Sequence, residues 1–136
     1  MIKHYKIELR SYPAGFHLIT NEILAAIDTL PESGLMNIFI KHTSAGLTLN
    51  ENADPSVRYD FKETFDRLIP ENSPWFTHVF EGSDDMPAHL KSSLVSSSIT
   101  IPIINGRLDL GTWQGIWLCE FRRHGGRRKI TITIWS

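Results

Sequence analysis

The chain has 136 residues, a length that suits a single domain spanning residues 1–136. Its 14 Lys and Arg residues and 15 Asp and Glu residues give a formal net charge of -1, so no strong overall field attracts nucleic acid or an anionic membrane. Cys119 is the only cysteine and has no partner for an intrachain disulfide, which favours a reducing compartment. The sequence contains neither a run of about 18 apolar residues nor an apolar signal-peptide core. We therefore expect a cytoplasmic protein.

The first part of the chain predicts a strand and a short helix. Residues 2–9 alternate between outward polar and inward apolar side chains, the pattern of a strand with one solvent-facing side. In the segment that follows, apolar residues recur at helical intervals. This pattern predicts a helix that is capped by Thr20 or Asn21 and closed by Pro31 and Gly34.

The next two elements are a buried strand and an amphipathic helix. The segment 35–42 is largely apolar, and its alternation places His42 on the same face as two isoleucines. Asp54 followed by Pro55 is a strong helix start, because aspartate caps the first free N–H groups and proline suits the first helical position. We expect this helix to end at Pro70.

The remaining chain predicts a long loop, another helix and two hairpins. Residues 71–85 lack any period and predict a loop, and a short helix with Asp85 as a possible cap follows over 86–95. Asn105-Gly106 fits a type I′ hairpin turn, and we expect a second hairpin to turn at Gly125-Gly126. The predicted class is α+β, with mostly antiparallel sheets and two or three short flanking helices.

Glu120 lies in a segment, TWQGIWLCEF, that is apolar on both faces and therefore predicts a central strand. Its side chain shares a face with Ile116 and Leu118, where a carboxylate is costly unless it is paired or binds a metal. Two interpretations follow. Glu120 belongs to a functional site, or it sits at a strand end where it reaches water or pairs with an arginine. We interpret Cys119 as a small core residue.

Two histidines and three carboxylates gather in the long loop and the helix after it, namely His78, Glu81, Asp84, Asp85 and His89. Two neutral imidazoles and one carboxylate are sufficient to bind a divalent ion and leave positions open. The spacing matches no known zinc motif, so a solvated acidic loop whose histidines cap helices is an equal alternative. The sequence leaves open whether Asp84 or Asp85 is the acidic ligand.

Two further polar segments have weaker interpretations. The stretch HTSAGLTLNENADP, residues 42–55, places much polar chemistry beside an apolar strand, although a lone His42 on an apolar face is usually a satisfied core residue. The basic segment 122–129 lacks the interleaved aromatic residues and net positive charge of a nucleic-acid site. We interpret it as a solvated hairpin tip.

Three motifs, HTSAGLTLNENADPSVRYDF, HVFEGSDDMPAHLKSSL and GRLDLGTWQGIWLCEF, resemble the YjbQ family, also named secondary thiamine-phosphate synthase. The resemblance covers essentially the whole chain. It implies an α+β protein that forms a homotrimer with a polar cleft near the subunit contacts. Carried over residue by residue, the family's polar positions fall on His42, Thr43, Asn50, Glu51, Asp54, His78, Glu81, Asp85, His89, Thr112, Gln114 and Glu120.

The named activity would join a pyrimidine diphosphate to a thiazole phosphate with release of pyrophosphate. The resemblance then implies a divalent ion, Mg or Zn, bound by His78, His89 and Asp85. The candidate general bases are Glu81, Glu120 and Glu51. Arg107 or Lys91 would hold phosphate oxygens, and the remaining ligand-binding candidates are His42, Thr43, Asn50, Asp54, Thr112 and Gln114.

Two other functions remain open. A metal-dependent hydrolase would use the same ligands to activate water, and a non-catalytic trimer would bind a small phosphorylated metabolite without turnover. In each case the expected partner is a small molecule and a second copy of the chain. We expect neither nucleic acid nor membrane as a partner.

Overall fold

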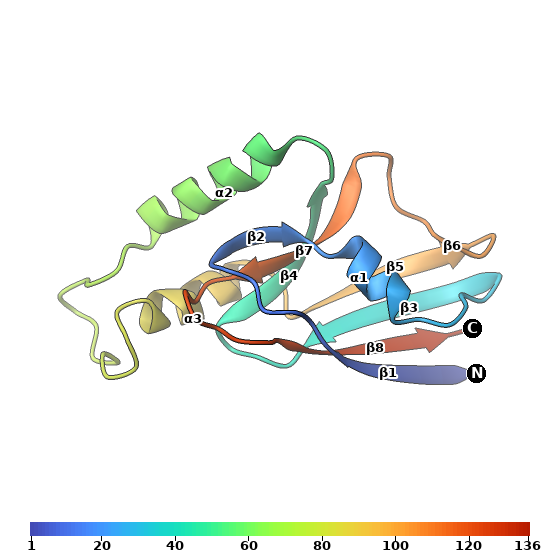
Figure 1. Ribbon diagram of the computed structural model, residues 1–136, viewed down its shortest axis with the longest axis horizontal. Helices are drawn as coiled ribbons and strands as arrows, with labels where there is room; N and C mark the ends of the chain where they lie inside the picture. Colours follow the sequence, from blue (N-terminus) through green and yellow to red (C-terminus); the bar gives the residue numbers. More distant parts are fainter.

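Two antiparallel sheets face each other across a hydrophobic core in the computed structural model, which describes residues 1–136 (Figure 1). The five-stranded sheet has the order β1 (Ile2–Glu8), β8 (Lys129–Trp135), β3 (Ser33–Ile40), β5 (Ser98–Ile104) and β6 (Arg107–Leu108). The three-stranded sheet has the order β2 (Gly15–Leu18), β7 (Gln114–Glu120) and β4 (Ala45–Glu51). The helices are α1 (Thr20–Ala25), α2 (Pro55–Leu68) and α3 (Asp85–Leu94). The predicted α+β class is confirmed.

Strand β7 is the central strand of its sheet and is buried on both faces, as its sequence predicts. Ile116 and Leu118 face the isoleucine-rich core between the sheets. Trp117 and Cys119 belong to a second apolar cluster on the other face, which α2 covers (Figure 1). There the Trp117 ring lies 4.9 Å from that of Phe61, in an edge-to-face arrangement that favours aromatic packing. One strand therefore contributes to both apolar clusters.

Two local signals are confirmed at the positions the sequence predicts. Asp54 caps α2, because its carboxylate accepts a 2.9 Å hydrogen bond from the Ser56 N–H, and Pro55 is the first helical residue. Asn105 and Gly106 have positive φ angles, of 53° and 74°, and turn β5 back onto β6. Both signals act within a few residues, so tertiary context does not override them.

The second predicted hairpin is wrong. Strand β7 pairs with β2 and β4, whereas β8 pairs with β1 and β3 in the other sheet. The chain changes sheets between them, and a buried ion pair marks this crossing. Arg128 donates from Nε to Glu120 Oε1 at 2.7 Å and from a terminal nitrogen to Oε2 at 2.5 Å. Gly125 is required for close approach, because a Cβ there would overlap both side chains of the pair.

The predicted first helix is too long, and β2 and β4 have no counterpart among the expected elements. Helix α1 ends at Ala25 and has no side-chain cap. The Thr20 hydroxyl instead accepts the Ile116 N–H at 2.9 Å and attaches the helix start to β7. Gly34 lies in β3, where a Cβ would overlap the Trp135 main chain. Sheet packing thus overrides a helical pattern that depends on few residues.

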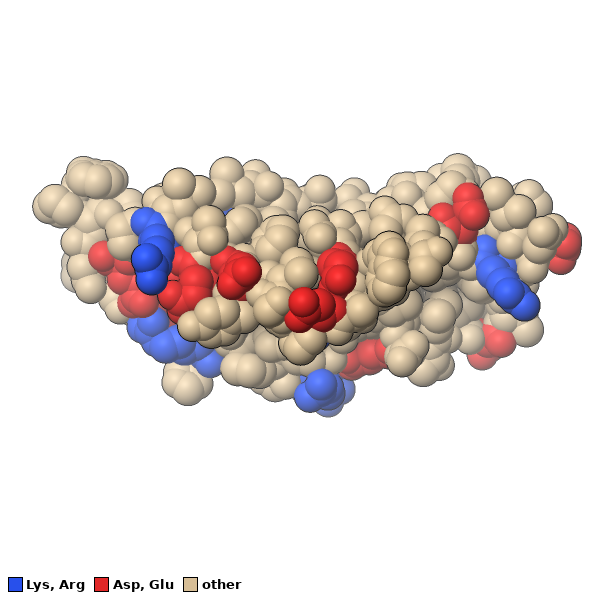
Figure 2. Space-filling view, turned by 90° about the horizontal axis from the view of Figure 1, so that it is seen from above, with Lys and Arg blue, Asp and Glu red and all other residues tan.

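The surface that carries α2 shows acidic and basic side chains separated by broad uncharged areas (Figure 2). Two pairs on this helix have the i, i+4 spacing that places side chains one turn apart. They join Lys62 to Asp66 at 2.7 Å and Glu63 to Arg67 at 3.7 Å. None of the three helices is long and apolar enough to cross a membrane.

The ion pair at the sheet crossing predicts a stability effect. Replacing Glu120 with Gln leaves the buried Arg128 without a counter-charge, so we expect the free energy of unfolding to fall by about 3 kcal/mol. Denaturant unfolding measures this change. The control Glu63→Gln removes an exposed carboxylate and should cost less than about 1 kcal/mol. Adding Arg128→Met to Glu120→Gln should recover part of the loss, and a Glu120→Gln protein as stable as the wild type would contradict the assignment.

Candidate functional site

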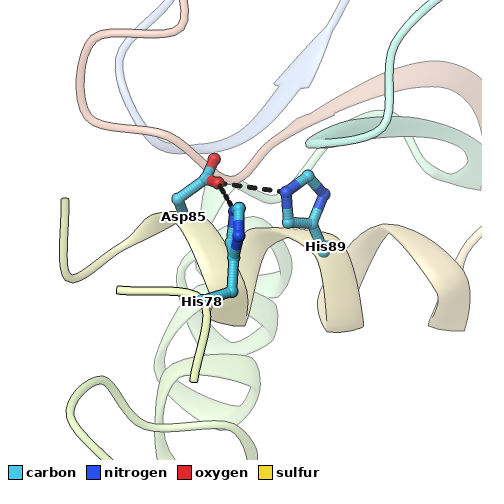
Figure 3. A group of neighbouring side chains, drawn as sticks. All are labelled: His78, Asp85 and His89. Atoms are coloured by element: carbon cyan, nitrogen blue, oxygen red, sulfur yellow. Dashed lines mark hydrogen bonds and ion pairs between the residues drawn. The ribbon is translucent and has the colours of Figure 1, made fainter. Parts of the chain in front are cut away.

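Asp85, His78 and His89 meet at the start of α3 (Figure 3). Asp85 is the first residue of the helix, and His89 lies one turn later on the same face. His78 comes from the preceding loop. Both imidazole Nε2 atoms approach the same oxygen, Asp85 Oδ2, at 2.7 Å from His78 and 3.0 Å from His89. The structure thus brings together the three residues that the sequence suggested as metal ligands.

The hydrogen bonds of His89 determine which ring nitrogen carries the proton. Its Nδ1 lies 3.0 Å from the main-chain oxygen of Thr43, which can only accept, so Nδ1 must donate. In the neutral ring, Nε2 then has a lone pair and faces the carboxylate oxygen of Asp85. Nε2 and Oδ2 are then two acceptors 3.0 Å apart, an arrangement that a cation bound by both atoms would stabilise. Donation of the other N–H to a main-chain carbonyl is also how metal-binding histidines are oriented.

Asp85 is fixed by a basic residue on its other side. Its side chain is 3% exposed, and Oδ1 accepts from a terminal nitrogen of Arg122 at 2.5 Å. Burial raises the pKa of Asp85, but the hydrogen bond with His78 and the charges of His89 and Arg122 outweigh burial and hold the pKa below its ordinary value. The carboxylate is therefore ionised at neutral pH and directs Oδ2 toward the imidazoles.

Asp84 contacts neither imidazole and has a different set of partners from Asp85. Its Oδ2 accepts from Arg122 Nε at 3.2 Å and from the Arg123 N–H at 2.9 Å. Both partners belong to the connection between β7 and β8. Asp84 therefore joins the start of α3 to this connection, while Asp85 occupies the acidic position beside the histidines.

The connection between β7 and β8 also holds the loop that carries His78. Arg122 donates to the main-chain oxygen of Glu81 at 2.8 Å, and Arg123 pairs with Glu71 at 2.7 Å. The interpretation of residues 122–129 as a solvated hairpin tip is therefore wrong for these arginines. Their partners lie about 40 to 50 positions earlier in the chain, beyond the range of any local sequence pattern.

A polar groove of about 500 Å³ adjoins the cluster and shares His89 with it. Its other lining residues include His42, Thr43, Ser92 and Ser97. The Nε2 atom of His42 accepts the Lys129 N–H at 2.8 Å, which leaves its Nδ1–H without a partner in the chain. Burial lowers the pKa of His42, and the nearby Arg128 charge lowers it further. A neutral donor and several hydroxyl groups therefore line the groove.

Of the three candidate bases, only Glu81 lies at the cluster. One of its carboxylate oxygens is 3.6 Å from His78 Nε2, and its side chain is 64% exposed. Glu120 is buried in the pair with Arg128. Glu51 accepts the Asp54 N–H at 2.7 Å and stabilises the turn before α2. Glu120 and Glu51 therefore have structural contacts that account for them.

Of the polar residues in the stretch 42–55, only His42 and Thr43 line the groove. Asp54 instead caps α2, and the Asn50 side chain accepts the N–H of the residue after it. These contacts explain the clustering of polar residues there without a ligand. The phosphate candidate Lys91 is also engaged, since it is buried and pairs with Asp66 at 2.6 Å.

Three further ligand-binding candidates lie elsewhere in the fold. Arg107 begins β6, at the end of the molecule opposite α3 (Figure 1). Gln114 begins β7 and lines a separate hollow. The main-chain oxygen of Thr112 accepts a hydrogen bond from Asn52, whose side chain lines that same hollow. Arg122 is a site residue that the sequence did not suggest, because only the folded chain places it against Asp85.

Comparison with known proteins agrees with the motifs. The family described as UPF0047 protein YjbQ-like matches residues 5–136. The chain belongs to this family. It is 52% identical over 130 residues to the YjbQ protein of Salmonella typhimurium, covering 94% of each chain. It is also 46% identical over 104 residues to YugU of Bacillus subtilis, covering 76% of each.

Two solved structures share the fold. A conserved hypothetical protein from Thermus thermophilus has a TM-score of 0.82 at 35% identity, covering 93% of this chain and 96% of that one. A YjbQ/UPF0047 family protein from Clostridium acetobutylicum has a TM-score of 0.78 at 37% identity, covering 98% and 99%. Both likenesses extend over nearly the whole chain.

The contacts of Asp85 predict how its pKa responds to substitution. Replacing Arg122 with Met removes a positive charge but leaves the carboxyl buried, so we expect its pKa to rise from below 3.8 toward or above that value. Carboxyl carbon NMR during a pH titration measures this shift. Arg123→Met is the matched control, because Arg123 contacts Asp84 and Glu71 but not Asp85.

The sign of the stability change follows from the lowered pKa. In the wild type, the stability from ionised Asp85 is present above pH 3.8 and is lost as pH falls through its native pKa. On acidification, the free energy of unfolding of Arg122→Met should fall by less than that of the wild type. An Asp85 pKa that is the same in wild type and Arg122→Met would contradict this account.

Proposed function

We propose that His78, Asp85 and His89 bind a divalent metal ion, and that the adjoining groove binds a phosphorylated small molecule on which the ion acts. The observation that carries this proposal is the approach of His89 Nε2 to Asp85 Oδ2, with Nδ1 already donating to Thr43. A cation bound by these residues would relieve the repulsion between the two acceptors. The third ligand atom, on His78, lies within 4.8 Å of the others.

The donor set favours zinc or a similar transition ion over magnesium. Two imidazole nitrogens and one carboxylate oxygen suit zinc, iron or manganese, whereas magnesium prefers oxygen ligands. Arg122 supports this role because it occupies Asp85 Oδ1 and leaves Oδ2 for the ion. The His78 side chain is 43% exposed and that of His89 is 31% exposed, so a substrate can reach the cluster from solvent.

The reaction that this arrangement supports best is the one the family's alternative name states, thiamine-phosphate synthesis. A divalent ion would supply positive charge to neutralise the departing diphosphate. The chain's own residues orient the reactants, since His42 offers a free N–H donor and the groove serines offer hydroxyl groups. The synthesis releases no proton from the attacking thiazole nitrogen, so Glu81 would orient the reactants by accepting hydrogen bonds at its exposed carboxylate.

One observation favours a second candidate, metal-dependent hydrolysis of a phosphate ester. Glu81 is the only carboxylate beside the cluster that is largely exposed, which is where a base that acts on water would lie. The two functions differ in their need for an acceptor. Synthesis requires a thiazole phosphate, whereas hydrolysis proceeds without one.

The metal proposal predicts a difference between two histidine variants. His89→Ala removes a ligand and should lower zinc affinity by about tenfold or more, while the fold is retained. His124→Ala is the matched control, because His124 is an exposed histidine outside the cluster. Isothermal titration of chelator-treated protein with zinc measures both. Equal zinc affinity in wild type and His89→Ala would refute the site.

Product analysis of zinc-loaded wild type then tests the reaction. We expect pyrimidine diphosphate and thiazole phosphate together to yield thiamine phosphate and pyrophosphate, and His89→Ala to lose this activity. Release of phosphate or diphosphate without the thiazole acceptor would support hydrolysis instead. Zinc binding without turnover of either substrate would indicate a metal-dependent binding protein. That result would overturn both proposed reactions.

We also propose that the chain forms a homotrimer, because the family resemblance implies one and large aromatic side chains are exposed. Trp117 is fully buried and contributes nothing to such a contact, but Trp113 is 64% and Phe80 is 96% exposed. Light scattering at micromolar concentration should give three times the 15.5 kDa chain mass. A monomer mass would exclude the trimer.

A further inference from the structure

A second hollow, of about 740 Å³, lies apart from the metal cluster and shares no residue with the groove beside it. Its polar lining comes from the segment before β2, the start of α1, the turn after β4 and the start of β7. The residues that line it are Arg10, Tyr12, Leu18, Thr20, Asn21, Glu22, Asn52 and Gln114. Its volume is in the range of small-molecule sites.

Arg10 presents an unpaired cation to this hollow. Its guanidinium carbon lies 4.1 Å from the centre of the Tyr12 ring, and the group forms no ion pair within the chain. Tyr12 is itself fixed, because it is only 6% exposed and its hydroxyl donates to Glu22 at 2.8 Å. Stacking on a fixed ring restricts the guanidinium while its N–H donors remain available.

The negative charge in the hollow is already engaged by the protein. Glu22 uses one carboxylate oxygen to accept from the Tyr12 hydroxyl and the other to accept the Arg10 main-chain N–H at 2.9 Å. Burial, together with Glu22, raises the pKa of Tyr12, so the hydroxyl remains a donor at neutral pH. Glu22 therefore supports the platform under Arg10 without pairing with its guanidinium.

Two side-chain amides provide further hydrogen-bonding groups. The Gln114 oxygen accepts the Gly111 N–H at 2.8 Å, which leaves the Gln114 amide nitrogen free to donate. The Asn52 nitrogen donates to the main-chain oxygens of Thr112 and Gln114, both at 3.1 Å, which leaves its oxygen free to accept. The hollow thus offers a cation, a donor and an acceptor whose orientations are set by the protein.

From this arrangement we infer that the hollow binds a phosphorylated polyol the size of a sugar phosphate, with Arg10 on the phosphate and Gln114 and Asn52 on the hydroxyl groups. A guanidinium binds phosphate through two parallel hydrogen bonds, and amides bind hydroxyl groups as donor and acceptor. The site is independent of the metal proposal, because no residue is shared and no metal is needed.

Titration of chelator-treated protein with ribose 5-phosphate tests this site. We expect saturable binding by calorimetry, with amide NMR shifts at the Asn52 and Gln114 side chains. Arg10→Gln should weaken binding by about tenfold or more, because it removes the charge on the hydrogen-bond donor. Lys6→Gln is the control, since Lys6 is another exposed cation without an ion pair and lies in β1, outside the hollow. It should bind as the wild type does.

Several outcomes would overturn the inference. These are no binding by the wild type, equal affinity in Arg10→Gln, binding of ribose as strong as that of ribose 5-phosphate, or NMR shifts confined to the His42 groove. Light scattering of Arg10→Gln tests whether the hollow is instead occupied by a side chain from a second copy of the protein. If the variant changes its oligomeric state, the hollow is a subunit contact and not a metabolite site. Unfolding curves that match the wild type show that the variant is folded.

Discussion

The burial of β7 on both faces is the constraint on which the rest of the structure depends. An ordinary antiparallel strand needs cover on one face, but β7 carries Ile116 and Leu118 on one side and Trp117 and Cys119 on the other. The five-stranded sheet covers the first side, and α2 and α3 cover the second. Ala88 of α3 is fully buried in the aromatic cluster. This packing fixes α3, the helix that carries Asp85 and His89 of the candidate site.

The site is therefore built from a rigid part and a part held by charges. Asp85 and His89 sit on a helix packed against the core, whereas His78 belongs to a loop joined to the β7–β8 connection by Arg122 and Arg123. Exposed ion pairs contribute little stability each, so the loop should open at lower free energy than the helix. A loop of this kind can admit a ligand without disturbing the core.

The sequence correctly predicted the structural features that depend on residues adjacent in the chain. Asp54 before Pro55 determines the start of α2, and Asn105 before Gly106 determines a hairpin, because each acts through its own backbone. The metal candidates were also predictable in part, since Asp85 and His89 are one helical turn apart. Their distance from His78 was not, because it depends on how the loop folds back onto α3.

The predictions that were wrong share a physical cause. Each concerned a feature that is determined by contacts between segments far apart in the sequence. The second hairpin was expected from two glycines, but the buried pair of Glu120 and Arg128 stabilises a crossing between sheets. The same crossing places Arg122 against Asp85, a contact across 37 positions. The family resemblance assigned both Gln114 and Glu120 to the cleft, although the two residues lie at opposite ends of β7.

The length of β7 separates the two proposed sites. Gln114 begins the strand at the hollow, and the chain reaches Arg122 beside Asp85 two residues after the strand ends. At about 3.3 Å per residue, the distance from Gln114 to Arg122 is on the order of 25 Å, which exceeds the length of a sugar phosphate. Within one chain, a small metabolite that contacts Gln114 is therefore too short to contact Arg122 as well. The two proposed sites are therefore separate, and β7 runs from the hollow toward the cluster of His78, Asp85 and His89.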